Sequence, residues 1–69
     1  MKKYIRYIGF SKKYNKKIAI TSCAETERAD IIRLYEYFEP ETIIEVRELT
    51  GELLDRCELQ VIFNYEKFN

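Results

Sequence analysis

The sequence contains no histidine, and it has only two glycines, one proline and two cysteines. Without histidine the chain lacks the commonest general base near neutral pH and the commonest metal-binding side chain. Two glycines cannot build a glycine-rich phosphate-binding loop. The shortage of glycine and proline also leaves little room for a flexible linker, and the chain shows no internal repeat. We therefore expect residues 1–69 to form one small domain.

The two cysteines, Cys23 and Cys57, lie far apart in the chain, and neither has a Cys-x-x-C partner. A structural zinc site would then need carboxylate ligands, so we expect no metal and no cofactor. Two cysteines are few for a secreted disulfide scaffold, and we interpret both as small core residues. No apolar run approaches the roughly 20 residues that span a bilayer. The sequence also begins without the apolar stretch of a signal peptide, so we expect a cytoplasmic protein.

The first half of the chain predicts a β-hairpin followed by a helix. Aromatic and β-branched residues indicate a strand over residues 3–10, and an alternating pattern indicates a second strand over residues 18–21. The run Ser22–Glu25 has the form of a helix capping box. Pro40 disfavours helical geometry at the residue before it and should close the helix. The helix has an apolar stripe that should cover the sheet, formed by Ile31, Leu34, Tyr35 and Phe38.

The second half predicts two further strands. Residues 42–49 are rich in β-branched residues, and Thr50 with Gly51 supplies a tight reversal. Residues 52–66 are apolar at nearly every odd position, which favours a long strand or two collinear ones. A C-terminal helix stays open as an alternative, because Leu54 also begins a helical apolar stripe. The predicted fold is α+β: a ββαββ order, with an antiparallel sheet of about four strands and one helix on one face.

Charge is strongly segregated along the chain although the net charge is zero. Residues 1–24 carry seven of the twelve lysines and arginines and none of the twelve acids. Carboxylate pairs in the other part, such as Glu36 with Glu39, are better explained as a solvated helix face than as an acid–base pair, because so small a domain has little interior in which to raise a carboxyl pKa. We therefore predict a protein that is not an enzyme and that acts by binding.

The first hypothesis is that the acidic helix surface docks onto a basic surface of another protein. Charge complementarity would speed the encounter and set the register of the complex. The residues expected to bind the partner are Glu25, Glu27, Asp30, Glu36 and Glu39.

The alternative is that a basic hairpin contacts nucleic acid, with a tyrosine stacking on exposed bases. The residues concerned are Lys12, Lys13, Tyr14, Lys16 and Lys17. A nucleic-acid-binding domain usually carries net positive charge, which this chain lacks. A third class, capture of a small nucleotide between protomers, would need a basic pocket. The same lysines also fit a solvated turn and a protected sheet edge with no binding role.

The first strand has apolar residues on both faces, while a single helix can cover only one face of the sheet. The other face would then expose apolar surface. A homodimer that buries this second face is one way to cover it.

One stretch resembles a pattern found in small proteins of phages and mobile elements. It begins at Lys17-Ile-Ala-Ile-Thr-Ser-Cys-Ala-Glu-Thr-Glu-Arg-Ala29 and ends, after a helix, at Ile43-Ile44-Glu45-Val46. DpnD/PcfM-like proteins are similar in this respect. The resemblance is a fold signature and carries over no binding or catalytic residue. It implies an accessory protein that inhibits or redirects a host protein, such as one of a host defence system.

Overall fold

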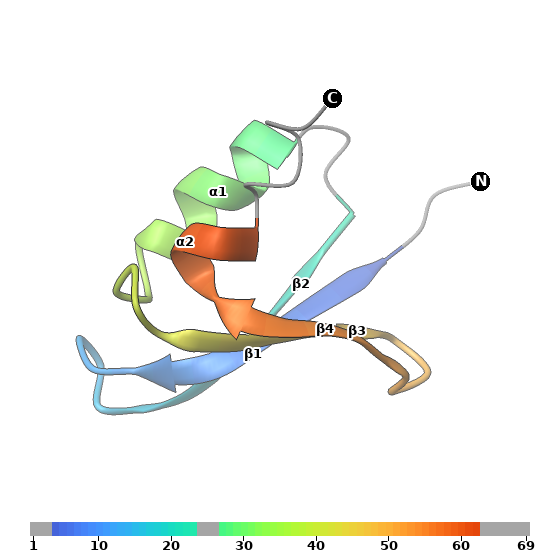
Figure 1. Cartoon of the computed structure of the whole chain (residues 1–69), viewed down its shortest axis with the longest axis horizontal. Coiled ribbons are helices and arrows are strands. Elements are labelled where there is room, and N and C mark those ends of the chain that lie inside the picture. The colour runs from blue at the N-terminus through green and yellow to red at the C-terminus, as the bar shows by residue number, and fades with distance from the viewer. Residues whose placement is uncertain (1–3, 24–26, 63–69) are drawn as a thin grey trace.

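A computed structural model of the chain describes residues 4–23 and 27–62. Within them the elements follow the order ββαββα (Figure 1). They are β1 (Ile5–Ser11), β2 (Lys16–Ser22), α1 (Glu27–Tyr35), β3 (Ile43–Glu48), β4 (Leu53–Glu58) and α2 (Leu59–Ile62). The predicted small α+β fold with a four-stranded antiparallel sheet is confirmed.

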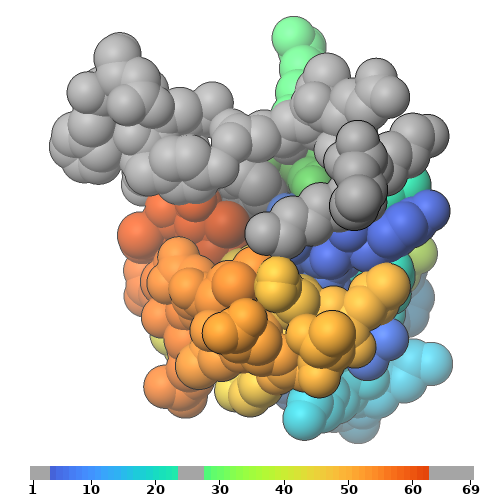
Figure 2. Space-filling view, turned by 90° about the vertical axis from the view of Figure 1, so that its right-hand side faces the viewer, coloured from blue at the N-terminus to red at the C-terminus, as the bar shows by residue number. Residues whose placement is uncertain are grey.

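The sheet has the strand order β2-β1-β3-β4, and every neighbouring pair is antiparallel. β1 and β3 are central, and β2 and β4 are the two edges. Both helices lie on the same side of the sheet (Figure 1). Figure 2 looks along the sheet from the β3–β4 turn and shows β4 and β2 on opposite sides of the molecule. No helix of the described residues lies on the other side of the sheet, which we call the open face.

The core lies between the sheet and the helical layer. Because successive strand residues point to opposite faces, alternate positions of the strands reach the core. The helical layer covers them with side chains spaced three or four residues apart. The buried apolar residues are Tyr7, Ile20, Ile44 and Val46 from the sheet and Leu34, Phe38, Leu59 and Ile62 from the other layer.

The helix α1 is shorter than the sequence pattern indicated. Ser22 is the last residue of β2 rather than a helix cap, so the predicted capping box is wrong. The helix ends at Tyr35, well before Pro40, and the amide of Tyr37 donates to the carbonyl oxygen of Leu34 in a tighter turn at 3.0 Å. Tyr35 is 43% exposed and does not join the core, because consecutive helix residues point about 100° apart.

The C-terminal half is a short strand followed by a helical turn, so the prediction of one long strand over residues 52–66 is wrong beyond Glu58. The amides of Leu59 and Gln60 donate to the carbonyl oxygens of Thr42 and Pro40, at 2.8 and 3.0 Å. These bonds turn the chain over the core, where Leu59 and Ile62 are buried three positions apart. Residues 63–66 of the predicted strand lie outside the described residues.

Gly9 allows the centre of the sheet to approach the helical layer closely. A Cβ atom at this position would lie 2.5 Å from Cδ1 of Ile44 and 3.3 Å from Cε1 of Phe38. It would also lie 3.2 Å from the carbonyl oxygen of Ile43. Glycine is therefore required here by packing against neighbouring atoms.

We expect Gly9→Ala to lower the free energy of unfolding by about 1–3 kcal/mol, the usual cost of overpacking a core. Ile44→Val removes the nearest atom, so the double variant should lose less stability than the sum of the two single variants. Urea denaturation of the four proteins measures this coupling. If the losses of unfolding free energy in the two single variants add up to the loss in the double variant, the Ile44 side chain does not cause the destabilisation by Gly9→Ala.

Candidate functional site

Asp30 is buried and connects α1 to the sheet through hydrogen bonds. Asp30 is only 8% exposed. The Tyr7 hydroxyl donates to Asp30 Oδ2 at 3.0 Å, and the Ser22 hydroxyl donates to Asp30 Oδ1. A carboxylate in such a place needs hydrogen-bond donors to offset its lost hydration. Asp30 is therefore buried against the sheet and does not lie on the exposed helix surface on which the sequence analysis placed it.

A sequence signal for this burial existed. Asp30 precedes Leu34 by four positions, so the two side chains lie on the same side of α1. Leu34 is fully buried, and Asp30 shares its direction towards the sheet.

The other predicted acidic residues are not gathered on one helix surface. Glu36 and Glu39 are exposed, but both follow the end of α1. Glu27 is the first residue of the helix, and its side chain is not among those described. Glu25 lies outside the described residues. Of the five predicted acidic residues, Glu36 and Glu39 are therefore the two that the structure describes as exposed.

The predicted basic residues are divided between the hairpin turn and β2. Lys12 and Lys13 are exposed in the turn. Lys16 and Lys17 are the first residues of β2 and point to opposite faces of the sheet. Of the five predicted residues, Lys17 is the one placed on the open face.

Tyr14 packs at the hairpin tip against the segment that follows α1. Its ring centroid lies 5.6 Å from that of Tyr37, and the Lys13 Nζ lies 5.8 Å from the Tyr14 centroid. The same Nζ donates to the carbonyl oxygen of Glu36 at 3.5 Å. Ser11 is fully buried below the tip. Its hydroxyl donates to the Tyr37 carbonyl oxygen at 2.5 Å and accepts from the Tyr14 amide at 3.2 Å.

The open face combines exposed apolar side chains with charges of both signs. Strand register and alternation place four basic and two acidic residues there. Three large apolar side chains on it are about half exposed: Phe10 at 51%, Ile43 at 47% and Leu53 at 47%. The full set is Arg6, Ile8 and Phe10 of β1, Lys17, Ala19 and Thr21 of β2, Ile43, Glu45 and Arg47 of β3, and Leu53, Arg56 and Glu58 of β4.

A depression of about 220 Å³ lies on the open face, and it includes side chains from all four strands. Ile8, Phe10 and Ile43 give it an apolar lining. Charged residues complete the lining: Lys17, Glu45 and Arg56. Small-molecule sites are usually larger, at about 300–1,000 Å³. This depression is therefore smaller than a usual small-molecule site.

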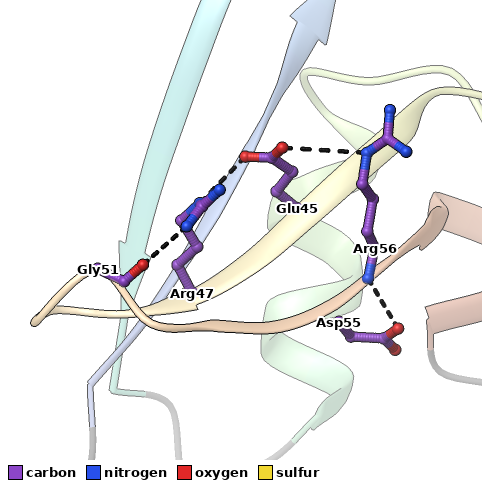
Figure 3. Close-up of polar contacts among 5 residues, drawn as sticks. All are labelled: Glu45, Arg47, Gly51, Asp55 and Arg56. Carbon is purple, nitrogen blue, oxygen red and sulfur yellow. Dashed lines mark hydrogen bonds and ion pairs between the residues drawn. The ribbon is translucent and has the colours of Figure 1, made fainter.

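Glu45 organises the charges beside this depression (Figure 3). Its Oε1 pairs with the Arg47 Nε at 3.1 Å, and its Oε2 lies 3.9 Å from the Arg56 Nε. A second nitrogen of Arg47 donates to the Gly51 carbonyl oxygen at 2.7 Å, which holds the β3–β4 turn. The amide of Arg56 donates to Asp55 Oδ1 at 2.7 Å. These contacts align the two arginines along the open face.

Arg6 and Arg47 are direct cross-strand partners on the two central strands. Like charges in directly opposite positions are unfavourable in an antiparallel sheet. Glu45 offsets part of this repulsion through its ion pair with Arg47. Arg6 and Arg47 nevertheless place two positive charges side by side on the open face.

Sequence reasoning predicted an uncovered apolar face of the sheet, but it did not identify the residues that form it as a site. The apolar residues on both faces of the first strand indicated an uncovered face. The residues that meet there come from four strands. The residues that β4 contributes could be assigned only once the structure showed that this strand ends at Glu58.

Both cysteines are free thiols, and Cys57 is half-buried. Cys23 is exposed, so its interpretation as a core residue is wrong. Burial raises the pKa of the Cys57 thiol above its ordinary value. The nearby carboxylates of Asp55 and Glu58 raise it further. The Cys57 Sγ donates to Asp55 Oδ2 at 3.7 Å. Such a thiol is a poor nucleophile, because the thiolate is the reactive form.

Within the described parts of the chain, no cluster of three or more potential metal-binding side chains is found. No helix among these residues has the length and apolar character needed to cross a membrane. Comparisons with protein-family models, curated proteins and solved structures gave no match.

We expect Asp30→Ala to lower the free energy of unfolding by about 1–3 kcal/mol, because the buried Tyr7 and Ser22 hydroxyls lose their acceptor. Glu39→Ala is the control, since Glu39 is exposed and its removal should change stability by less than about 0.5 kcal/mol. Thermal and urea unfolding of both variants give the comparison. Equal stabilities would mean that Asp30 does not tie the helix to the sheet.

We also expect iodoacetamide to alkylate Cys57 more slowly in the folded protein than in the urea-unfolded chain at pH 8. The raised thiol pKa reduces the thiolate fraction, so the pH at half-maximal rate should move upwards. Asp55→Asn removes one of the raising charges and should speed the reaction. Peptide mass spectrometry separates Cys57 from Cys23. A native Cys57 that reacts as fast as the unfolded thiol would contradict the assignment.

Proposed function

We propose that this protein acts without catalysis, by binding a protein partner through the open face of its sheet. The supporting observation is the half-exposed pair of Phe10 and Ile43, which line one depression on a face that no described helix covers. Protein interfaces commonly place aromatic and aliphatic anchors at the centre and charges at the rim. The open face likewise combines half-exposed apolar side chains with charged residues.

The depression refines the proposal. Phe10 and Ile43 offer an apolar seat for one side chain of the partner, and Lys17, Glu45 and Arg56 surround it with both signs of charge. The residues lie on paired strands, so their positions are largely set before binding. A preorganised surface loses less conformational entropy on association than a loop does.

The exposed acids Glu36 and Glu39 remain a second possible contact for a basic partner, as the sequence predicted. The resemblance to small proteins of phages and mobile elements supports a host protein as the partner, including a protein of host defence. Inhibition or redirection of that protein would follow from stoichiometric binding.

Nucleic-acid binding is the second candidate, and the opposing Arg6 and Arg47 favour it. Phe10, next to its cross-strand partner Lys17, could stack on a base while the cations contact phosphates. The open face carries two more basic than acidic residues, which is a modest excess for such a role.

The test is capture of partners from a nuclease-treated host lysate by three tagged proteins: wild type, Phe10→Asp and Ile32→Asp. Ile32 is a matched control, because it is a large apolar residue 57% exposed on α1. We expect Phe10→Asp to weaken capture of a specific protein by about 30-fold, the effect of losing about 2 kcal/mol at an interface anchor. Ile32→Asp should bind as wild type does.

Capture that survives in Phe10→Asp and fails in Ile32→Asp would overturn the open face as the contact. Loss of capture in a Glu36→Lys, Glu39→Lys double variant alone would move the contact to the acidic residues. Capture from a parallel lysate without nuclease, lost after nuclease treatment, would favour the nucleic-acid candidate.

A further inference from the structure

The outer edge of β2 has no neighbouring strand among the described residues, because the sheet order is β2-β1-β3-β4. Such an edge presents backbone amides and carbonyls that can pair with another strand. β2 is seven residues long and contains neither proline nor glycine, and no register shift interrupts its pairing with β1. At the opposite edge, the pairing of β4 with β3 is interrupted by a register shift between Val46 and Arg47 of β3.

The sequence of β2 is complementary to itself in one antiparallel register. With Ala19 opposite Ala19 of a second copy, all seven residues find partners. Lys16 then faces Ser22, Lys17 faces Thr21, and Ile18 faces Ile20. No lysine meets another lysine, so the residues that would protect this edge do not prevent self-pairing.

The edge strand β4 lacks this property. A two-fold axis perpendicular to the sheet keeps each residue on its own face, so one residue must lie opposite itself at the axis. The two central choices in β4 are Asp55 and Arg56. Either choice places two identical charges in contact, which is unfavourable. Charge therefore selects β2 over β4 for pairing between copies.

We propose that two copies of this chain associate through β2 in the register centred on Ala19. The two four-stranded sheets then form one continuous sheet of eight strands. On the helix side, Ile18 of each copy gains contact with Ile20 of the other. This interface differs from burial of the open face, which stays accessible in the dimer. The proposal therefore does not depend on the proposed function.

The first experiment is sedimentation equilibrium of the wild-type protein at high micromolar concentration. We expect twice the 8.4 kDa mass of the chain. Ala19→Lys places two lysines opposite each other at the axis and should restore the monomer. Ala19→Glu should do the same, and an equimolar mixture of the two variants should dimerise again.

Cysteine cross-linking tests the register independently, in a Cys23→Ser, Cys57→Ser background. Two Ala19→Cys side chains would face each other with Cα atoms about 4.5–5.5 Å apart, within disulfide range. Thr21→Cys is the matched control, because it lies in the same strand and is also exposed. In this register its Cα atoms would be about 14 Å apart and could not be bridged.

Under mild oxidation we expect at least tenfold more covalent dimer from Ala19→Cys than from Thr21→Cys. A monomeric wild-type protein at high micromolar concentration would overturn the proposal. So would equal cross-linking of the two cysteine variants, or an Ala19→Lys variant that remains a dimer. Circular dichroism of each variant confirms that the fold is retained.

Discussion

The attachment of α1 to the sheet depends on Asp30 and the two hydroxyls that donate to it. The helix has nine residues, and isolated helices shorter than about 12–15 residues are marginal in water. Its stability must therefore come from docking. Leu34 supplies the apolar contact, and Asp30 fixes the position of the helix relative to β1 and β2.

The same docking explains why one face of the sheet stays open. Both helical segments pack over the side on which Gly9 permits close approach, and the chain has no further described element to cover the other side. Small domains commonly leave apolar surface exposed, because they bury only about 60% of the surface of the unfolded chain. The uncovered strands of this protein hold a defined depression with ordered charges beside it.

Much of the fold could be predicted from the sequence because its signals are local. Aromatic and β-branched residues identified β1 and β3, and alternation identified β2. The stripe through Leu34 and Phe38 identified the helical layer. The C-terminal half was ambiguous, since Leu59 fits both a strand and a helix pattern. Its structure depends on the hydrogen bond from the Leu59 amide to the Thr42 carbonyl oxygen, a contact across the fold that local patterns do not report.

The candidate site was harder to predict for a related physical reason. Phe10 and Ile43 come together only through the pairing of β1 with β3, so no local motif joins them. The acidic residues, in contrast, looked continuous in sequence but separate in space. Asp30 turns inwards to the sheet, while Glu36 and Glu39 lie beyond the end of the helix.

The hairpin tip and the segment that follows α1 are held together by several contacts. Ser11 joins them from below through the Tyr37 carbonyl oxygen and the Tyr14 amide, and the two tyrosine rings meet above. Lys13 reaches the backbone of Glu36 across the same junction. The basic hairpin turn and the acidic segment that follows α1 therefore lie side by side, although they are more than 20 residues apart in the sequence.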